Sequence, residues 1–227
     1  MATATANGKG VARTATSTPK AETLTISAPN FQTIDLRIEG TSPYMQARFS
    51  YKTMITMAEK MKAGSTAKKG AKKDPRDFDA DYQGAMHVSE EGWIGMPASA
   101  FRNACISACR MCGFQMTRAK LSVFVLADGV DVVDGTPLIR IEGEPERSQM
   151  MVRNATGVPD IRVRPMWRKW AAVVRIRFDA DQFTAQDVVN LLARVGMQVG
   201  IGEGRPDSKS SAGMGFGLFR IATGLTG

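Results

Sequence analysis

The sequence is short of cysteine, histidine and aromatic residues. Among its 227 residues are three cysteines and one histidine, and aromatic residues make up 7%. Cys105, Cys109 and Cys112 crowd together and cannot form an even disulfide framework, which favours a reducing compartment. Long apolar runs are also missing. No window approaches the roughly 18 residues of a membrane helix, and residues 1–22 lack the apolar core of a signal peptide. We therefore expect a cytoplasmic protein with no membrane partner.

Positive charge, by contrast, is plentiful. The chain has 30 Lys and Arg against 22 Asp and Glu, a formal net charge of +8 and a pI near 9.6. An excess of this size promotes association with polyanions but does not specify a fold. The window 147–177 is the most basic, with Asp160 as its single acidic residue. The segment 62–76 carries four lysines within residues 68–73 among turn-forming residues, which predicts a solvent-exposed loop.

Hydrophobic periodicity predicts strands and two long helices. The first helix is expected to begin at Ser99 as N-cap and to end at Gly113. The second begins at Thr184, where Thr184 and Asp187 resemble a capping box, and ends at Gly196. Alternating residues predict strands at 24–27, 34–39, 121–126, 137–142, 171–178 and 216–222.

The order of these elements predicts an α+β fold. Two β-α-β-like halves suggest a ferredoxin-like, RRM-type sheet, and a small parallel α/β protein is the alternative. Residues 1–22 read as a flexible tail, and residues 23–227 form a single domain. We expect the basic loop at 62–76 and a protruding basic hairpin, inserted at about 144–170, to extend from this domain.

The segment 196–217 is rich in glycine. Glycine permits positive φ, so closely spaced glycines can turn successive amide groups toward one anion, phosphates above all. Arg205 and Lys209 add positive charge to the same segment. A helix precedes the segment and a strand follows it, which is the reverse of a dinucleotide-binding motif, so we expect no cofactor. The alternative is a Gly/Ser loop that serves packing alone.

Three stretches resemble the RAMP superfamily, specifically the backbone subunits of CRISPR effector complexes. Residues 94–105, IGMPASAFRNAC, are similar to the family's I-P-x-S-x-L-K/R-x-x-R entry to its first helix. Residues 153–159, RNATGVP, are similar to its R-x-x-T-G region. Residues 191–203, LLARVGMQVGIGE, with 213–221, GMGFGLFRI, resemble its C-terminal glycine-rich loop.

The resemblance implies a non-enzymatic protein that polymerises along single-stranded nucleic acid, RNA in preference to DNA. Such a protein is a helical homo-oligomer that can join other subunits of a ribonucleoprotein complex. In the family, the start of the first helix and the glycine-rich loop together hold the backbone of the strand. The resemblance therefore places Ser99, Arg102 and Asn103 of the helix beside Gly202, Gly204 and Arg205 of the loop. Met150 and Met151 become candidate wedges between nucleotides. The remaining candidate contacts are basic: Arg153, Arg162, Arg164, Arg168, Lys169 and Lys209.

Other functions leave traces in the sequence. Some RAMP members cleave RNA with an aspartate after the first strand, but Asp35 falls inside the predicted strand, so we expect no such activity. His87 is the candidate for a metal-independent endoribonuclease, and a phage structural protein is a third reading. The C-x-x-x-C-x-x-C spacing of 105–112 matches iron–sulfur enzymes, yet within a helix it marks one buried face. Five aromatic residues could stack on bases, although burial is the commoner outcome: Trp93, Trp167, Trp170, Tyr44 and Tyr51.

Overall fold

The computed structural model describes residues 27–48, 55, 58–59, 61–62, 76–153, 157, 159–208 and 213–222. The predicted tail at 1–22 lies outside these ranges, as do nearly all of the predicted strand at 24–27 and of the basic segment at 62–76. The described chain is α+β with antiparallel sheets, which confirms the predicted class.

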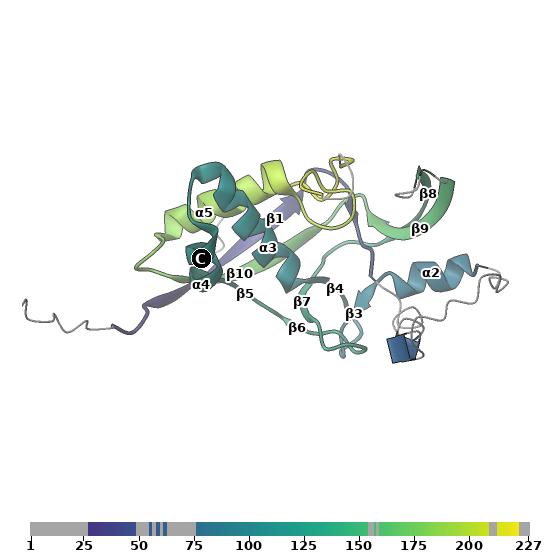
Figure 1. The fold of residues 1–227 in the computed structure, drawn as a ribbon, viewed down its shortest axis with the longest axis horizontal. Coiled ribbons are helices and arrows are strands. Elements are labelled where there is room, and N and C mark those ends of the chain that lie inside the picture. The colour runs from purple at the N-terminus through teal and green to yellow at the C-terminus, as the bar shows by residue number, and fades with distance from the viewer. Residues whose placement is uncertain are drawn as a thin grey trace, which may run out of the picture.

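The central sheet has four antiparallel strands. Their spatial order is β11 (Phe219–Ile221), β1 (Phe31–Gly40), β10 (Ala171–Asp179) and β5 (Val123–Leu126). Two helices, α3 (Ala98–Cys109) and α5 (Ala185–Arg194), lie together over this sheet (Figure 1). Along the chain, α3 lies between β1 and β5, and α5 lies between β10 and β11.

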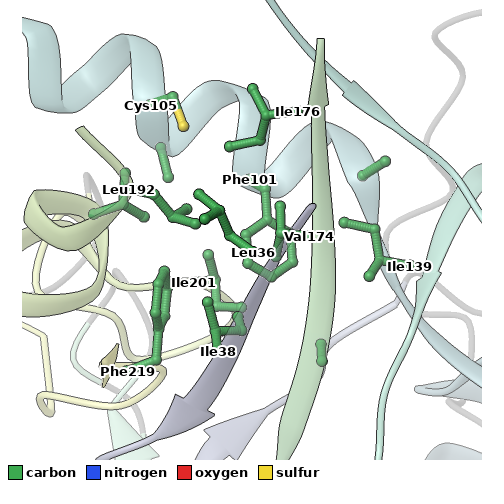
Figure 2. Close-up of a cluster of buried hydrophobic side chains, with 14 of the residues drawn as sticks. Leu36, Ile38, Phe101, Cys105, Ile139, Val174, Ile176, Leu192, Ile201 and Phe219 are labelled. Carbon is green, nitrogen blue, oxygen red and sulfur yellow. The ribbon is translucent and has the colours of Figure 1, made fainter. Parts of the chain in front are cut away.

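The core forms where the alternating strands meet the two helices. Leu36 on β1 and Ile176 on β10 are buried, and Figure 2 shows them beside Phe101 of α3 and Leu192 of α5. Phe219 of β11 closes the same cluster. The intervening β10 residues point away from the helices, so the predicted alternation of this strand is confirmed.

Two smaller sheets extend from this body. One contains β2 (Tyr44–Met45), β9 (Pro159–Trp167) and β8 (Glu146–Arg153). The other contains β3 (His87–Val88), β4 (Ile94–Pro97), β7 (Pro137–Arg140) and β6 (Gly129–Val130). Strands β8 and β9 pair along their length as an antiparallel hairpin that projects from the body (Figure 1). The short helix α2 (Phe78–Gly84) packs against β9.

The helix ends show where local signals held. The side chain of Thr184 accepts a hydrogen bond from the Asp187 amide, and the Asp187 carboxylate accepts one from the Thr184 amide. The predicted capping box is therefore confirmed. Ser99 is not the N-cap of α3: the helix begins at Ala98, because β4 runs into it through Pro97, whose fixed φ suits a helix entry. This N-terminus has no side-chain cap.

Gly196 does not end α5. The helix ends at Arg194 and continues as a π-helical turn, Val195–Val199, to Gly200 with a φ of 71°. Gly196 is instead a site of close approach, because a Cβ there would lie 2.2 Å from the carbonyl oxygen of Phe219. The need for glycine at this position therefore comes from a contact distant in sequence and not from the end of the helix.

Two further differences concern the segment between α3 and β5. A helix, α4 (Met116–Ser122), precedes β5, so the strand predicted from Leu121 begins at Val123. Cys105 and Cys109 are buried as predicted, but Cys112 is exposed, because α3 has given way to a 3₁₀ helix over Arg110–Cys112. Burial raises the pKa of the Cys105 thiol to about 12, which opposes thiolate ligation of a metal cluster.

Candidate nucleic-acid interface

The glycine-rich segment folds back on itself between α5 and β11. Six of its glycines have positive φ: Gly200, Gly202, Gly204, Gly213, Gly215 and Gly217. The Ile201 amide donates to the Gly217 carbonyl at 3.1 Å, and the Met214 amide donates to the Gly204 carbonyl at 2.7 Å. Several amides that could have turned toward an anion are therefore used to close the loop.

The loop leans on β2, which lies beside the hairpin. A Cβ on Gly202 would lie 2.5 Å from the Met45 carbonyl oxygen and 2.6 Å from the Tyr44 ring, so only glycine allows this approach. The Glu203 amide donates to the same Met45 carbonyl at 2.9 Å. Because Tyr44 and Met45 pair with β9, the loop meets the base of the β8–β9 hairpin.

One carboxylate joins the loop to the hairpin. Arg162 Nη1 donates to Glu203 Oε1 at 3.0 Å, and Arg164 Nε donates to Glu203 Oε2 at 2.9 Å. We call these three residues the arginine clasp. Its side chains are only 20–34% exposed. Beside it, the amides of Gly202, Gly204 and Arg205 have no hydrogen-bond partner in the part of the chain that the structure describes.

Sequence reasoning missed Glu203. It identified the glycines and the arginines separately, and it treated the arginines as free for phosphate. The available signal was an acidic residue held between two glycines, Gly202 and Gly204, at a loop expected to meet basic residues. Its pairing with β9 spans about forty residues of sequence and follows from the fold, not from local pattern.

One face of α3 also meets the loop. Ser99, Asn103 and Ser107 follow at four-residue spacing and so share a helix face. Ser107 Oγ donates to Asp207 of the loop, and Arg110 pairs with Asp207 at 3.2 Å. The predicted Ser99 and Asn103 are exposed on this face.

Arg102 is not brought together with the loop. Its guanidinium donates to the carbonyls of Val123 at 3.2 Å and Lys120 at 2.6 Å, and it lies over the Phe124 ring at 5.1 Å. These contacts hold Arg102 at the edge strand β5. The reason is helical geometry: Arg102 lies roughly 100° around the helix from Asn103.

The two candidate wedges, Met150 and Met151, lie on opposite faces of the hairpin. Directly opposed residues of an antiparallel pair share a face, so Met150 lies with Arg162 and Met151 lies with Ile161. Met150 is half-buried on the side of the clasp. Met151 is 79% exposed and Ile161 is 42% exposed, so these two form an apolar pair open to solvent.

The other predicted basic residues differ in availability. Arg168 pairs with Glu146 at 2.7 Å, and Arg205 Nη1 donates to the Gly202 carbonyl at 3.0 Å. Lys169 is exposed and has no ion pair within the described ranges. The structure describes the backbone of Arg153 but not its side chain, and Lys209 lies outside the described ranges. The basic window therefore holds fewer open cations than its composition suggests.

His87 belongs to a buried ion-pair network. Its Nδ1 lies 2.8 Å from Asp131 Oδ2, while Arg48 Nη2 donates to Asp131 Oδ1 at 2.9 Å and to Asp134 at 3.2 Å. His87, Asp131 and Asp134 are close enough to hold a metal ion. However, the Arg48 guanidinium already pairs with both carboxylates, and Asp131 Oδ1 also accepts from the Val133 amide. These contacts support a structural role for the histidine.

Three of the five aromatic candidates are core residues. Trp167, Trp170 and Tyr44 are each at most 4% exposed, and the Tyr44 ring lies 5.5 Å from Trp167 and 5.6 Å from Trp170. For these three, burial is confirmed as the outcome, and stacking on bases is excluded. Trp93 is half-buried, and Tyr51 lies outside the described residues.

No helix in the described ranges is long and apolar enough to cross a membrane. No protein-family model matches the chain, and no curated protein matches it.

Proposed function

We propose that this protein binds single-stranded nucleic acid without cleaving it and oligomerises along the strand in the cytoplasm. The observation that carries the proposal is that the glycine-rich loop meets α3 through Asp207 and meets the base of a projecting hairpin through the arginine clasp. These elements offer guanidinium groups and amides that have no hydrogen-bond partner among the described residues, and the opposite face of the hairpin offers an exposed apolar pair.

The same proposal includes an RRM-like, ferredoxin-type core. The spatial order β11-β1-β10-β5 supports it, because β1 and β5 flank α3 in the chain, β10 and β11 flank α5, and both helices lie over the sheet that the four strands form. The resemblance to the RAMP superfamily is likewise a proposal. The first stretch leads into α3, and a later turn of α3 contacts the glycine-rich segment, where Ser107 donates to Asp207, which supports a shared surface. The preference for RNA comes from this resemblance.

Binding would use the backbone of the strand more than its bases. Arginine and lysine neutralise phosphates, so affinity should fall steeply with salt and depend little on sequence. Met151, with Ile161 beside it, is the side chain best placed to enter between nucleotides, because it is the more exposed of the two wedge candidates. Head-to-tail contacts between copies that do not close into a ring would generate a filament.

Fluorescence anisotropy with labelled single strands tests the proposal. We expect binding of RNA and weaker binding of DNA of the same sequence at low salt. The double variant Arg162→Ala/Arg164→Ala should bind more weakly by at least about tenfold, because two phosphate contacts are lost. Arg37→Ala/Arg175→Ala removes the same charge from ion pairs on the open face of the central sheet, and it serves as the control.

Two results would overturn the proposal. The first is a wild-type protein that binds neither strand at low salt. The second is an equal loss in both double variants, which would reduce the interaction to net charge. Purification after nuclease-free lysis adds an independent check, since co-purifying nucleic acid can be detected by absorbance and then sequenced.

A further inference from the structure

The arginine clasp contains its own anion. Each oxygen of the Glu203 carboxylate accepts from a different arginine, Arg162 at 3.0 Å and Arg164 at 2.9 Å. We propose that Glu203 occupies the position of a strand phosphate and must leave these arginines before the strand binds. Glu203 would then set the affinity of the interface. This inference rests on the proposed function and concerns the same site.

The loop places Glu203 by construction. Gly202 and Gly204, with φ of 80° and 77°, turn the backbone sharply on both sides of it. The Glu203 amide is anchored on the Met45 carbonyl, and Gly202 packs against Met45 and Tyr44 without room for a Cβ. Backbone contacts therefore hold residue 203 beside β9. Only its carboxylate makes the bonds to the arginines that a phosphate would replace.

A phosphodiester matches the position of this carboxylate chemically. Both groups carry about one negative charge and offer two oxygens to guanidinium donors, which arginine recognises in the same forked geometry. The exchange would leave the arginines paired throughout. The amides of Gly202, Gly204 and Arg205, which have no hydrogen-bond partner among the described residues, belong to the same loop and offer further donors to a phosphate.

Burial makes the competition matter. The Arg164 and Glu203 side chains are each 20% exposed, whereas the exposed pair of Arg168 and Glu146 is 66% and 57% exposed. Water screens the exposed pair, so Arg168 is open to phosphate at little cost. Arg164 has less access to water, and it gives up a stronger partner when it binds the strand. Asp160, 3.8 Å from Arg162, stays with the hairpin during the exchange.

The test compares Glu203→Gln with Glu142→Gln by anisotropy over a range of salt concentrations. Glu142 holds Arg37 through two bonds of 2.7 Å, so its substitution makes the same charge change on another surface. We expect Glu203→Gln to bind single-stranded RNA about tenfold more tightly than the wild type, since a neutral amide competes poorly for guanidinium. The salt slope should steepen, by up to about 0.7, because the clasp then carries one more net positive charge with which to neutralise a phosphate of the single strand.

A second variant covers the case in which Glu203→Gln does not fold. Glu203→Asp keeps the charge but shortens the side chain, so it cannot reach both arginines as Glu203 does. It should bind more tightly than the wild type and less tightly than Glu203→Gln. Circular dichroism and urea unfolding establish that each variant is folded.

The outcomes separate this inference from the proposed function. If the wild type binds and Glu203→Gln binds equally or more weakly, Glu203 orients the arginines and the inference is wrong, while the function stands. Equal tightening by Glu142→Gln also overturns it. Tighter binding by Glu203→Gln than by a wild type that itself binds, without tightening in Glu142→Gln, supports the inference, and binding by neither protein overturns both proposals.

Discussion

At the scale of residues, the availability of each arginine for a ligand depends on whether a carboxylate already pairs with it. Arg37 pairs with Glu142, Arg175 with Asp35, and Arg220 with Glu39, all on the open face of the central sheet. Water screens each exposed pair, so each adds little to the stability of the fold, but together they decide which guanidinium groups remain without a carboxylate. For that reason the distribution of partners, more than the net charge of +8, describes the binding surface.

Glycine at position 202 should be indispensable. Gly202→Ala combines a φ of 80° with a Cβ 2.5 Å from the Met45 carbonyl, so we expect it to destabilise the fold by about 3 kcal/mol or more in urea unfolding. Gly215→Ala is the matched control, because its φ is 74° and a Cβ there meets nothing within 4 Å. It should cost about 1–2 kcal/mol. Equal losses would show that crowding against β2 contributes little.

Asp131 should be the most sensitive acid in the protein. Its side chain is fully buried, and Asp131→Ala would leave the Arg48 guanidinium, 9% exposed, without its closest partner. We expect a loss of about 3–5 kcal/mol in urea unfolding. Asp134→Ala removes a longer contact from a side chain that is 25% exposed, and it should cost about 1 kcal/mol. A small effect of Asp131→Ala would contradict the structural role given to this network and to His87.

At the scale of elements, the signals that were read correctly are local. The Thr184–Asp187 capping box and the alternation of β10 depend on neighbours within a few residues. The misread features depend on distant contacts: Gly196 is set by Phe219, and the clasp arginines are set by Glu203. Helix α4 was missed because its apolar face is slight, with Ala119 buried and Leu121 71% exposed.

The hairpin offers a prediction that separates stability from binding. Met151→Ala should leave urea unfolding unchanged, because the side chain is 79% exposed, yet it should weaken binding of single-stranded RNA. A lost insertion between bases corresponds to about 1–3 kcal/mol of binding free energy, by analogy with stacking side chains. Val132→Ala, on an exposed side chain of the second small sheet region, is the control. Unchanged affinity of Met151→Ala would remove the wedge from the account.

At the scale of the whole molecule, the fold places a compact body beside a projecting arm. The central sheet and its two helices form the body, and the β8–β9 hairpin extends from it (Figure 1). The glycine-rich loop joins them, because it packs on β2 and bonds both α3 and β9. In the proposed filament, the arm of one copy would reach the next copy along the strand.

The most direct test is the mass of complexes formed on single-stranded RNA of increasing length, measured by analytical ultracentrifugation at low salt. If the protein coats the strand, the mass should rise in steps of one 24.6 kDa protomer as the RNA lengthens, and the complexes should dissociate as salt is raised. A complex that stays at one protomer whatever the length, or no complex at all, would contradict the account.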